Sequence, residues 1–152
     1  MRVALGSDHA GYPLKQRLIA ELERLGHAVE DLGTFAAEPP VDYPDFCFPV
    51  AERVAGGRAD RGIVLGGSGI GEAIAANKVK GIRASVVTSD ETARLTRLHN
   101  DSNVLALGAR TNAHEDAVRW LGIWLATPFE GGRHVARLQK IAAYESSHFL
   151  RK

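Results

Sequence analysis

The sequence predicts an α/β protein: a three-layer, Rossmann-like fold in which a five-stranded parallel sheet carries helices on both faces. Short apolar segments alternate with longer segments whose apolar residues recur every three or four positions, and this pairing occurs five times. The short segments are apolar throughout, which is typical of strands buried on both sides of a parallel sheet. The 152 residues fit a single domain, residues 1–152, because neither a linker nor a repeat divides them.

The expected elements follow one another along the whole chain. A first strand at 3–5 leads to a helix that begins near Pro13, where a proline loses no helical hydrogen bond, and stops at Gly26. Three prolines make residues 34–44 a loop. The other expected strands are 28–31, 61–65, 83–87 and 104–107. The other expected helices are 45–55, one from within 66–71 to about 78, 90–98, 115–126 and about 132–145, with 146–152 as a tail.

Composition narrows the classes of partner. The 19 Lys and Arg residues nearly balance the 18 Asp and Glu residues, which disfavours a basic protein that coats nucleic acid. No apolar run approaches the roughly 18 residues that cross a bilayer. The one cysteine, Cys47, excludes an intrachain disulfide and suits a reducing compartment. We therefore expect a cytoplasmic protein that binds neither nucleic acid nor membrane.

The segment 66–71 is the richest candidate for chemistry. In an open parallel sheet, ligands bind beyond the carboxyl ends of the strands, and this segment follows the third expected strand. Four glycines in six residues would let backbone N–H groups approach a phosphate or an oxyanion at the start of a helix. Its glycine spacing matches neither a P-loop nor a dinucleotide-binding fingerprint. The alternative is that the glycines only allow close packing between strand and helix.

Three further positions each admit a functional and a structural interpretation. Glu72 could be a carboxylate base beside the glycine loop, or a glutamate that favours the helix start. Arg133 and Arg137, four residues apart, could bind a phosphate together or form a solvated basic helix face. His99 ends a helix that runs about 15 Å back from the strand tips, so it would either serve a neighbouring subunit or merely cap its helix. No spacing of His, Cys and Asp resembles a closed metal site.

Seven motifs occur in order and together resemble the ribose-5-phosphate isomerase B family, over about residues 2–145. They are Gly6-Ser7-Asp8-His9-Ala10-Gly11, Asp42-Tyr43-Pro44, Gly67-Ser68-Gly69-Ile70-Gly71, Ala75-Ala76-Asn77-Lys78, Gly81-Ile82-Arg83, His99-Asn100-Asp101 and Gly131-Gly132-Arg133-His134 with Arg137. The resemblance implies an enzyme without metal or cofactor that interconverts an aldose phosphate and a ketose phosphate through an enediolate. It also implies a homodimer or tetramer of dimers with shared active sites, the last helix extending to the partner subunit.

The resemblance assigns roles to individual positions. The loop amides would hold the enediolate, Ser68 would assist proton movement between its oxygens, and His99 would open the sugar ring. The implied catalytic residues are Glu72, His99, Ser68 and Asp8. The implied substrate contacts are Asp8, His9, Tyr43, Gly67, Ser68, Gly69, Ile70, Gly71, Asn100, Arg110, Arg133 and Arg137, with the three arginines on the phosphate.

One position departs from the commoner family pattern. Many members carry the proton-abstracting cysteine where this chain has Gly66, whereas a second branch, with Gly-Gly-Ser-Gly-x-Gly-Glu, resembles this sequence more closely. In that branch the base is the glutamate, which is Glu72 here. A carboxylate is already ionised at neutral pH, so the exchange of base is chemically sensible.

The expected activity is the interconversion of ribose 5-phosphate and ribulose 5-phosphate. Two alternatives stay open at this stage. One is the same chemistry on a hexose 6-phosphate or a tetrulose 4-phosphate, for which the proline-rich 34–43 loop is the suspected determinant. The other is a non-catalytic protein that binds sugar phosphates, since a fold alone does not determine function.

Overall fold

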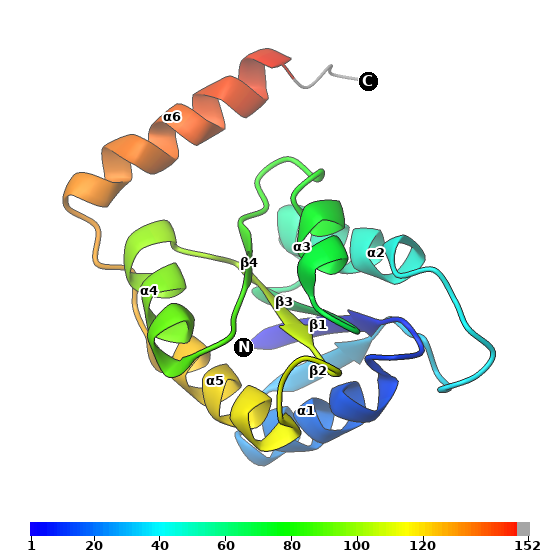
Figure 1. The fold of residues 1–152 in the computed structure, drawn as a ribbon. Coiled ribbons are helices and arrows are strands. Elements are labelled where there is room, and N and C mark those ends of the chain that lie inside the picture. Colours follow the sequence, from blue (N-terminus) through cyan, green and yellow to red (C-terminus); the bar gives the residue numbers. More distant parts are fainter. Residues whose placement is uncertain (149–152) are drawn as a thin grey trace.

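The computed structural model describes residues 1–148 as five strands and six helices (Figure 1). The strands are β1 (Arg2–Ser7), β2 (Ala28–Asp31), β3 (Arg61–Gly66), β4 (Ala84–Val86) and β5 (Val104–Gly108). The helices are α1 (Tyr12–Arg24), α2 (Pro44–Ala55), α3 (Ile70–Ala76), α4 (Asp90–Asn100), α5 (His114–Ala126) and α6 (Arg133–His148). The predicted order of elements is confirmed, and every predicted strand is present.

All strand pairs are parallel, in the order β2-β1-β3-β5-β4. The chain moves outward from β1 to β2 on one side and to β3 on the other, so the strand order reverses between β1 and β3. Ser7 pairs with Leu65, and Gly66 pairs with Gly108. The loops after β1, β3 and β5 therefore leave the same edge of the sheet side by side, which is where ligands bind in such folds.

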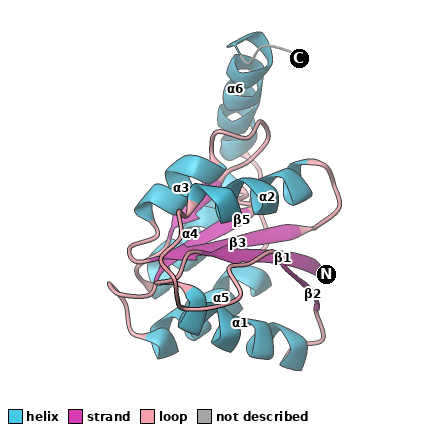
Figure 2. Cartoon of the chain, turned by 90° about the vertical axis from the view of Figure 1, so that its right-hand side faces the viewer, coloured by secondary structure: helices cyan, strands magenta, loops and turns pink. Residues whose placement is uncertain are grey.

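The two faces of the sheet pack against different helices (Figure 2). The core between the sheet and α1, α4 and α5 contains large side chains, among them Leu14, Leu121 and Trp124 of the helices. The core between the other face and α2 and α3 contains small side chains, such as Ala4 and Ala106 of the sheet and Ala73 of α3. Because alternate strand residues point to opposite faces, β1 contributes Val3 and Leu5 to the first core and Ala4 to the second. The small residues let α3 approach the sheet closely beside the strand tips.

The expected end of the last helix and the expected start of the tail both need correction. Helix α6 continues to His148, so residues 146–148 are helical rather than part of a tail, and the rest of that expected tail lies outside the described residues. In this last turn the Ser147 hydroxyl donates to the Ala143 carbonyl oxygen at 3.1 Å. Helix α6 extends away from the sheet and its covering helices (Figures 1 and 2).

No helix within residues 1–148 is long and apolar enough to cross a membrane.

Candidate active site

The carboxyl ends of β1 and β3 hold the first predicted site residue in a defined position. The Asp8 backbone N–H donates to the Leu65 carbonyl oxygen at 3.2 Å, which ties the loop after β1 to β3. The Asp8 carboxylate in turn accepts from the Gly11 backbone N–H at 2.9 Å. Asp8 is buried, with 8% of its surface exposed. A carboxylate is thus placed at the point where the strand order reverses.

The loop after β3 has the conformation that its glycines permit. Gly69 adopts a φ of +80°, and a Cβ there would lie 2.9 Å from the backbone carbon of Leu107. Both facts require glycine at this position, because a side chain would be strained and would collide with β5. The Ser68 Oγ accepts from the Ile70 backbone N–H at 3.2 Å. The loop therefore turns tightly at the strand tips and leads directly into α3.

Glu72, in the first turn of α3, folds back over the end of β3. A Cβ on Gly66 would lie 1.6 Å from the Glu72 Oε1 and 2.3 Å from its carboxyl carbon. The carboxylate thus occupies the space that any side chain at position 66 would fill. The glycine at position 66, where many family members resemble each other in having cysteine, therefore leaves room for the carboxylate of Glu72, six residues later in the sequence.

Burial sets the electrostatics of this carboxylate. Glu72 is only 3% exposed. Burial raises the pKa of Glu72 above its ordinary value and the charge of Asp8 raises it further, while backbone hydrogen bonds from Glu72 and Gly69 act against this rise. Cys47 is also buried, and burial together with the nearby Glu72 and Asp8 raises the pKa of its thiol. Cys47 is therefore suited to a place in the core rather than to the role of a nucleophile.

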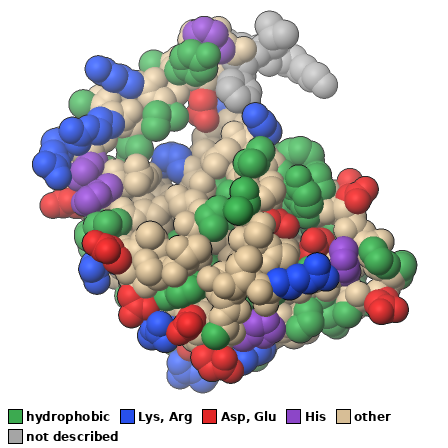
Figure 3. Space-filling model, in the orientation of Figure 1, with side chains coloured by type: hydrophobic (Ala, Val, Ile, Leu, Met, Phe, Trp, Pro, Cys, Tyr) green, Lys and Arg blue, Asp and Glu red, His purple; other side chains and the backbone are tan. Residues whose placement is uncertain are grey.

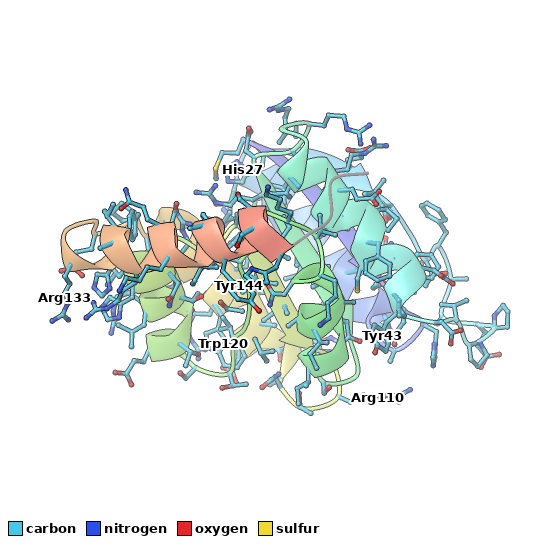
Figure 4. The ribbon with its side chains drawn as sticks, turned by 90° about the horizontal axis from the view of Figure 1, so that it is seen from above. His27, Tyr43, Arg110, Trp120, Arg133 and Tyr144 are labelled. Carbon is cyan, nitrogen blue, oxygen red and sulfur yellow. The ribbon has the colours of Figure 1, made fainter. Side chains whose placement is uncertain are left out.

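Tyr43 and Arg110 complete this side of the site. A Cβ on Gly71 would lie 2.8 Å from the Tyr43 ring, so the ring packs directly on the start of α3. The Arg110 backbone N–H donates to the Gly67 carbonyl oxygen at 2.9 Å, which places an exposed guanidinium side chain beside the glycine loop. Figure 4 shows Tyr43 and Arg110 on the same side of the molecule.

His9 is oriented by the proline-rich loop. The Val41 backbone N–H donates to the His9 Nδ1 at 3.1 Å. The Val41 carbonyl oxygen lies 3.3 Å from the same nitrogen, so the backbone of Val41 fixes the orientation of the His9 ring in either tautomer. We name the residues gathered here the strand-tip cluster. It consists of Asp8, His9, Tyr43, Gly67, Ser68, Gly69, Ile70, Gly71, Glu72 and Arg110.

The remaining predicted site residues form a second group, the outer cluster. It consists of His99 and Asn100 at the end of α4 and Arg133 and Arg137 at the start of α6. Arg133 lies at the opposite end of the molecule from Tyr43 and Arg110 (Figure 4). One chain therefore does not bring the two clusters together, in agreement with the direction of α4 that the sequence predicted.

His99 has two partners that the sequence analysis did not assign. Its ring stacks on that of His134, with centroids 4.3 Å apart and planes 15° apart. The Glu130 Oε2 lies 3.8 Å from the His99 Nε2 and 3.4 Å from the His134 Nε2. These side chains meet where α4 and the start of α6 converge, and Figure 3 shows histidine side chains there between basic and acidic ones. In the sequence, the four-residue spacing of Glu130 and His134 was the signal that could have indicated their contact.

His99, Glu130 and His134 also lie close enough together to hold a metal ion, a grouping that their spacing in the sequence did not indicate. Their ligand atoms lie within 4.8 Å of one another. Stacked rings, however, direct their nitrogen lone pairs side by side rather than toward one point, as a tetrahedral ion would require. The arrangement suits a shared proton better than a coordinated metal, and the absence of a metal stays a prediction.

Comparisons with known proteins show which family and which fold the chain resembles. A family model described as Ribose/Galactose Isomerase matches residues 3–141. The chain is 45% identical to ribose-5-phosphate isomerase B of Escherichia coli strain K12, over 95% of this chain and 96% of that protein. A structure of ribose-5-phosphate isomerase B from Clostridium thermocellum has a TM-score of 0.95 and 48% identity, covering 97% and 99% of the two chains. A structure of the Mycoplasma genitalium enzyme with bound ribulose 5-phosphate has a TM-score of 0.92 and 40% identity, covering 95% and 96%.

Proposed function

The chain belongs to the ribose/galactose isomerase family, and we propose that it interconverts ribose 5-phosphate and ribulose 5-phosphate by proton transfer through an enediolate. The observation that carries this proposal is the Glu72 carboxylate folded over Gly66 at the strand tips. Isomerisation needs a base beside the carbon next to the carbonyl group, and donors for the oxyanion that forms. Glu72 can supply the base, and the backbone N–H groups of the adjoining glycine loop can supply the donors.

The proton transfers of the isomerisation have candidate residues in the strand-tip cluster. Glu72 removes the proton from C2 of the open-chain aldose. Backbone N–H groups of the glycine loop stabilise the negative oxygen of the enediolate. The Ser68 hydroxyl can pass a proton between the oxygens on C1 and C2, and Glu72 then returns its proton to C1. The three arginines Arg110, Arg133 and Arg137 bind the phosphate.

Support for a five-carbon substrate comes from the relatives, which are named for ribose 5-phosphate. The test is a steady-state comparison of four-, five- and six-carbon sugar phosphates with the wild-type chain. We expect the highest kcat/KM for ribose 5-phosphate. A higher value for a hexose 6-phosphate or a tetrulose 4-phosphate would reassign the substrate, and binding of all three without turnover would favour a non-catalytic sugar-phosphate protein.

We also propose that two copies of the chain share each active site. The strand-tip cluster lacks a ring-opening acid of its own, while the outer cluster lies at the other end of the subunit (Figure 4). Helix α6 projects from the body with exposed apolar side chains, Val135, Ile141 and Tyr144, which suit burial against a second copy. We therefore assign a homodimer, or a tetramer of dimers, in which one subunit supplies the strand-tip cluster and its partner the outer cluster.

Mixing two inactive chains tests the shared site. A Glu72→Gln chain and a His99→Ala chain, each inactive on cyclic ribose 5-phosphate, should restore activity after their subunits are exchanged. Each mixed dimer would contain one site with both defects and one with neither, so random pairing should recover up to about a quarter of wild-type activity. No recovery despite demonstrated exchange would mean that each chain builds its own site.

We expect the protein to act in the cytoplasm, since its one cysteine is free and buried, as suits a reducing compartment.

A further inference from the structure

Glu130 holds a position that the isomerisation steps above do not explain. Its backbone N–H donates to the Leu98 carbonyl oxygen at 3.0 Å, which anchors the chain before α6 to the last turn of α4. This anchor brings its carboxylate within 4 Å of both Nε2 atoms of the His99–His134 stack. One carboxylate oxygen thus faces two imidazoles at once, and a charge of this sign favours a proton on either ring.

The stack itself limits how many protons it can hold. Two parallel imidazolium rings 4.3 Å apart would repel each other strongly, whereas one protonated ring beside one neutral ring would not. His134 is 6% exposed, and its Nε2 has no hydrogen-bond partner within the described chain. A buried polar atom without a partner is costly, so this nitrogen is suited to accept or share a proton that arrives from its neighbour.

The charges around the stack come from both elements that pack there. His99 belongs to α4, Glu130 to the segment before α6, and Arg133 and Arg137 to α6. Burial lowers the pKa of His134, and the charges of His99, Arg133 and Arg137 lower it further, while Glu130 raises it. Among the charged groups of residues 1–148 that shift the pKa of His134, Glu130 is the one that raises it.

We propose that Glu130 is a positioning residue for ring opening: it holds His99 and His134 as a pair that carries one proton between them, and so keeps His99 ready to donate to the sugar. This inference rests on the proposed function. It gives His134 a part in the reaction through His99.

The step can be written so that its atoms and charges balance. Protonated His99 donates to the ring oxygen O4 of ribose 5-phosphate while the C1–O4 bond breaks. The hydroxyl on C1 loses its proton to a base at the strand tips, for which Asp8 is the candidate, and becomes the aldehyde oxygen. Neutral His99 then regains a proton from water through the exposed Glu130 carboxylate, and Asp8 releases the proton that it took from the C1 hydroxyl to water. Nothing is oxidised or reduced.

The test uses the fact that ribulose 5-phosphate cannot close into a furanose, because its C5 oxygen carries the phosphate. Solvent-deuterium exchange at C1 of ribulose 5-phosphate therefore reports enediolate formation without ring opening. Conversion of ribose 5-phosphate requires both steps. The full-length oligomer carrying Glu130→Gln is compared with wild type in both assays, over a range of pH. Glu52→Gln, which removes the same charge from an exposed site on α2, is the matched control.

We expect Glu130→Gln to slow ribose 5-phosphate conversion at least tenfold, within the range that general acids contribute. Deuterium exchange into ribulose 5-phosphate should stay within about twofold of wild type, since it does not use the acid. Glu130→Asp should recover part of the rate, and Glu52→Gln should match wild type.

An equal loss in both assays would overturn the proposal, because Glu130 would then serve a shared step or the assembly. Unchanged activity in both assays would overturn it as well. The proposed function fails in a different way: wild-type protein would then exchange no deuterium into ribulose 5-phosphate and convert no ribose 5-phosphate.

Discussion

The strand-tip cluster and the outer cluster differ in how firmly a single chain builds them. Asp8 and Glu72 are buried at the carboxyl ends of β1 and β3, and backbone hydrogen bonds hold the loops that follow these two strands. Arg133 and Arg137 are exposed on a helix that projects from the body. In the shared site that we propose, one chain supplies the base and the oxyanion donors, and its partner completes the phosphate site and supplies the ring-opening acid. Chemistry that demands exact placement lies on the rigid sheet, and contacts that tolerate movement lie on the projecting helix.

The largest expected effect comes from removing the proposed base from the strand-tip cluster. Glu72→Gln keeps the size of the side chain but cannot accept the C2 proton, so kcat should fall about 10³-fold or more. Binding of ribose 5-phosphate, measured by calorimetry, should change little because the phosphate contacts are intact. Deuterium exchange at C1 of ribulose 5-phosphate should be lost as well, and near-normal exchange would remove Glu72 from the base role.

The second expected effect displaces the same carboxylate without altering it. A methyl group at Gly66→Ala would occupy the position of the Glu72 Oε1, so the carboxylate must move away from the substrate. We expect kcat to fall roughly 10²-fold, since a misplacement of about 1 Å can cost that much.

The control for this variant is Gly122→Ala in α5, where an added Cβ meets no atom within 4 Å. It should leave the rate unchanged and stabilise the fold by about 0.5–1 kcal/mol. If Gly66→Ala is as active as Gly122→Ala, then the packing of Glu72 over Gly66 does not matter for catalysis.

The third prediction concerns phosphate binding by the outer cluster. Arg133→Ala or Arg137→Ala should mainly raise KM, because a phosphate contact is made equally in the ground state and the transition state. Loss of one charge-assisted contact should cost about 1.5–3 kcal/mol, or about 10- to 150-fold in kcat/KM. Normal KM values in both variants would mean that the phosphate binds elsewhere.

The smallest expected effect is on stability and depends on pH. Burial raises the pKa of Glu72 in the folded chain above the ordinary value of 4.5, so ionisation opposes folding once the pH passes that value. Glu72→Gln should therefore raise the melting temperature at neutral pH, and the difference should shrink as the pH falls toward 4.5. A variant less stable than wild type at neutral pH would mean that the ionised carboxylate is a net stabilising group.

Much of the fold follows from local patterns. The apolar strands and the three-to-four spacing of α1 predict their elements, because burial on both faces of a parallel sheet leaves a continuous apolar segment. Pro49 lies inside α2 in the structure, although a proline in the interior of a helix is unfavourable. The packing of Cys47, Val50 and Ala51 against the sheet outweighs the hydrogen bond that the proline cannot make.

The sequence by itself identified the glycine loop, Glu72 and the separation of His99 from the strand tips, since each depends only on residue type, order and helix direction. Only the tertiary structure decided that Glu72 fills the space above Gly66 and that Glu130 faces two stacked histidines. The first depends on the path of a single turn at the strand tips. The second depends on contacts between α4 and α6, and residue order does not determine side-chain positions across two elements that meet only when the chain folds.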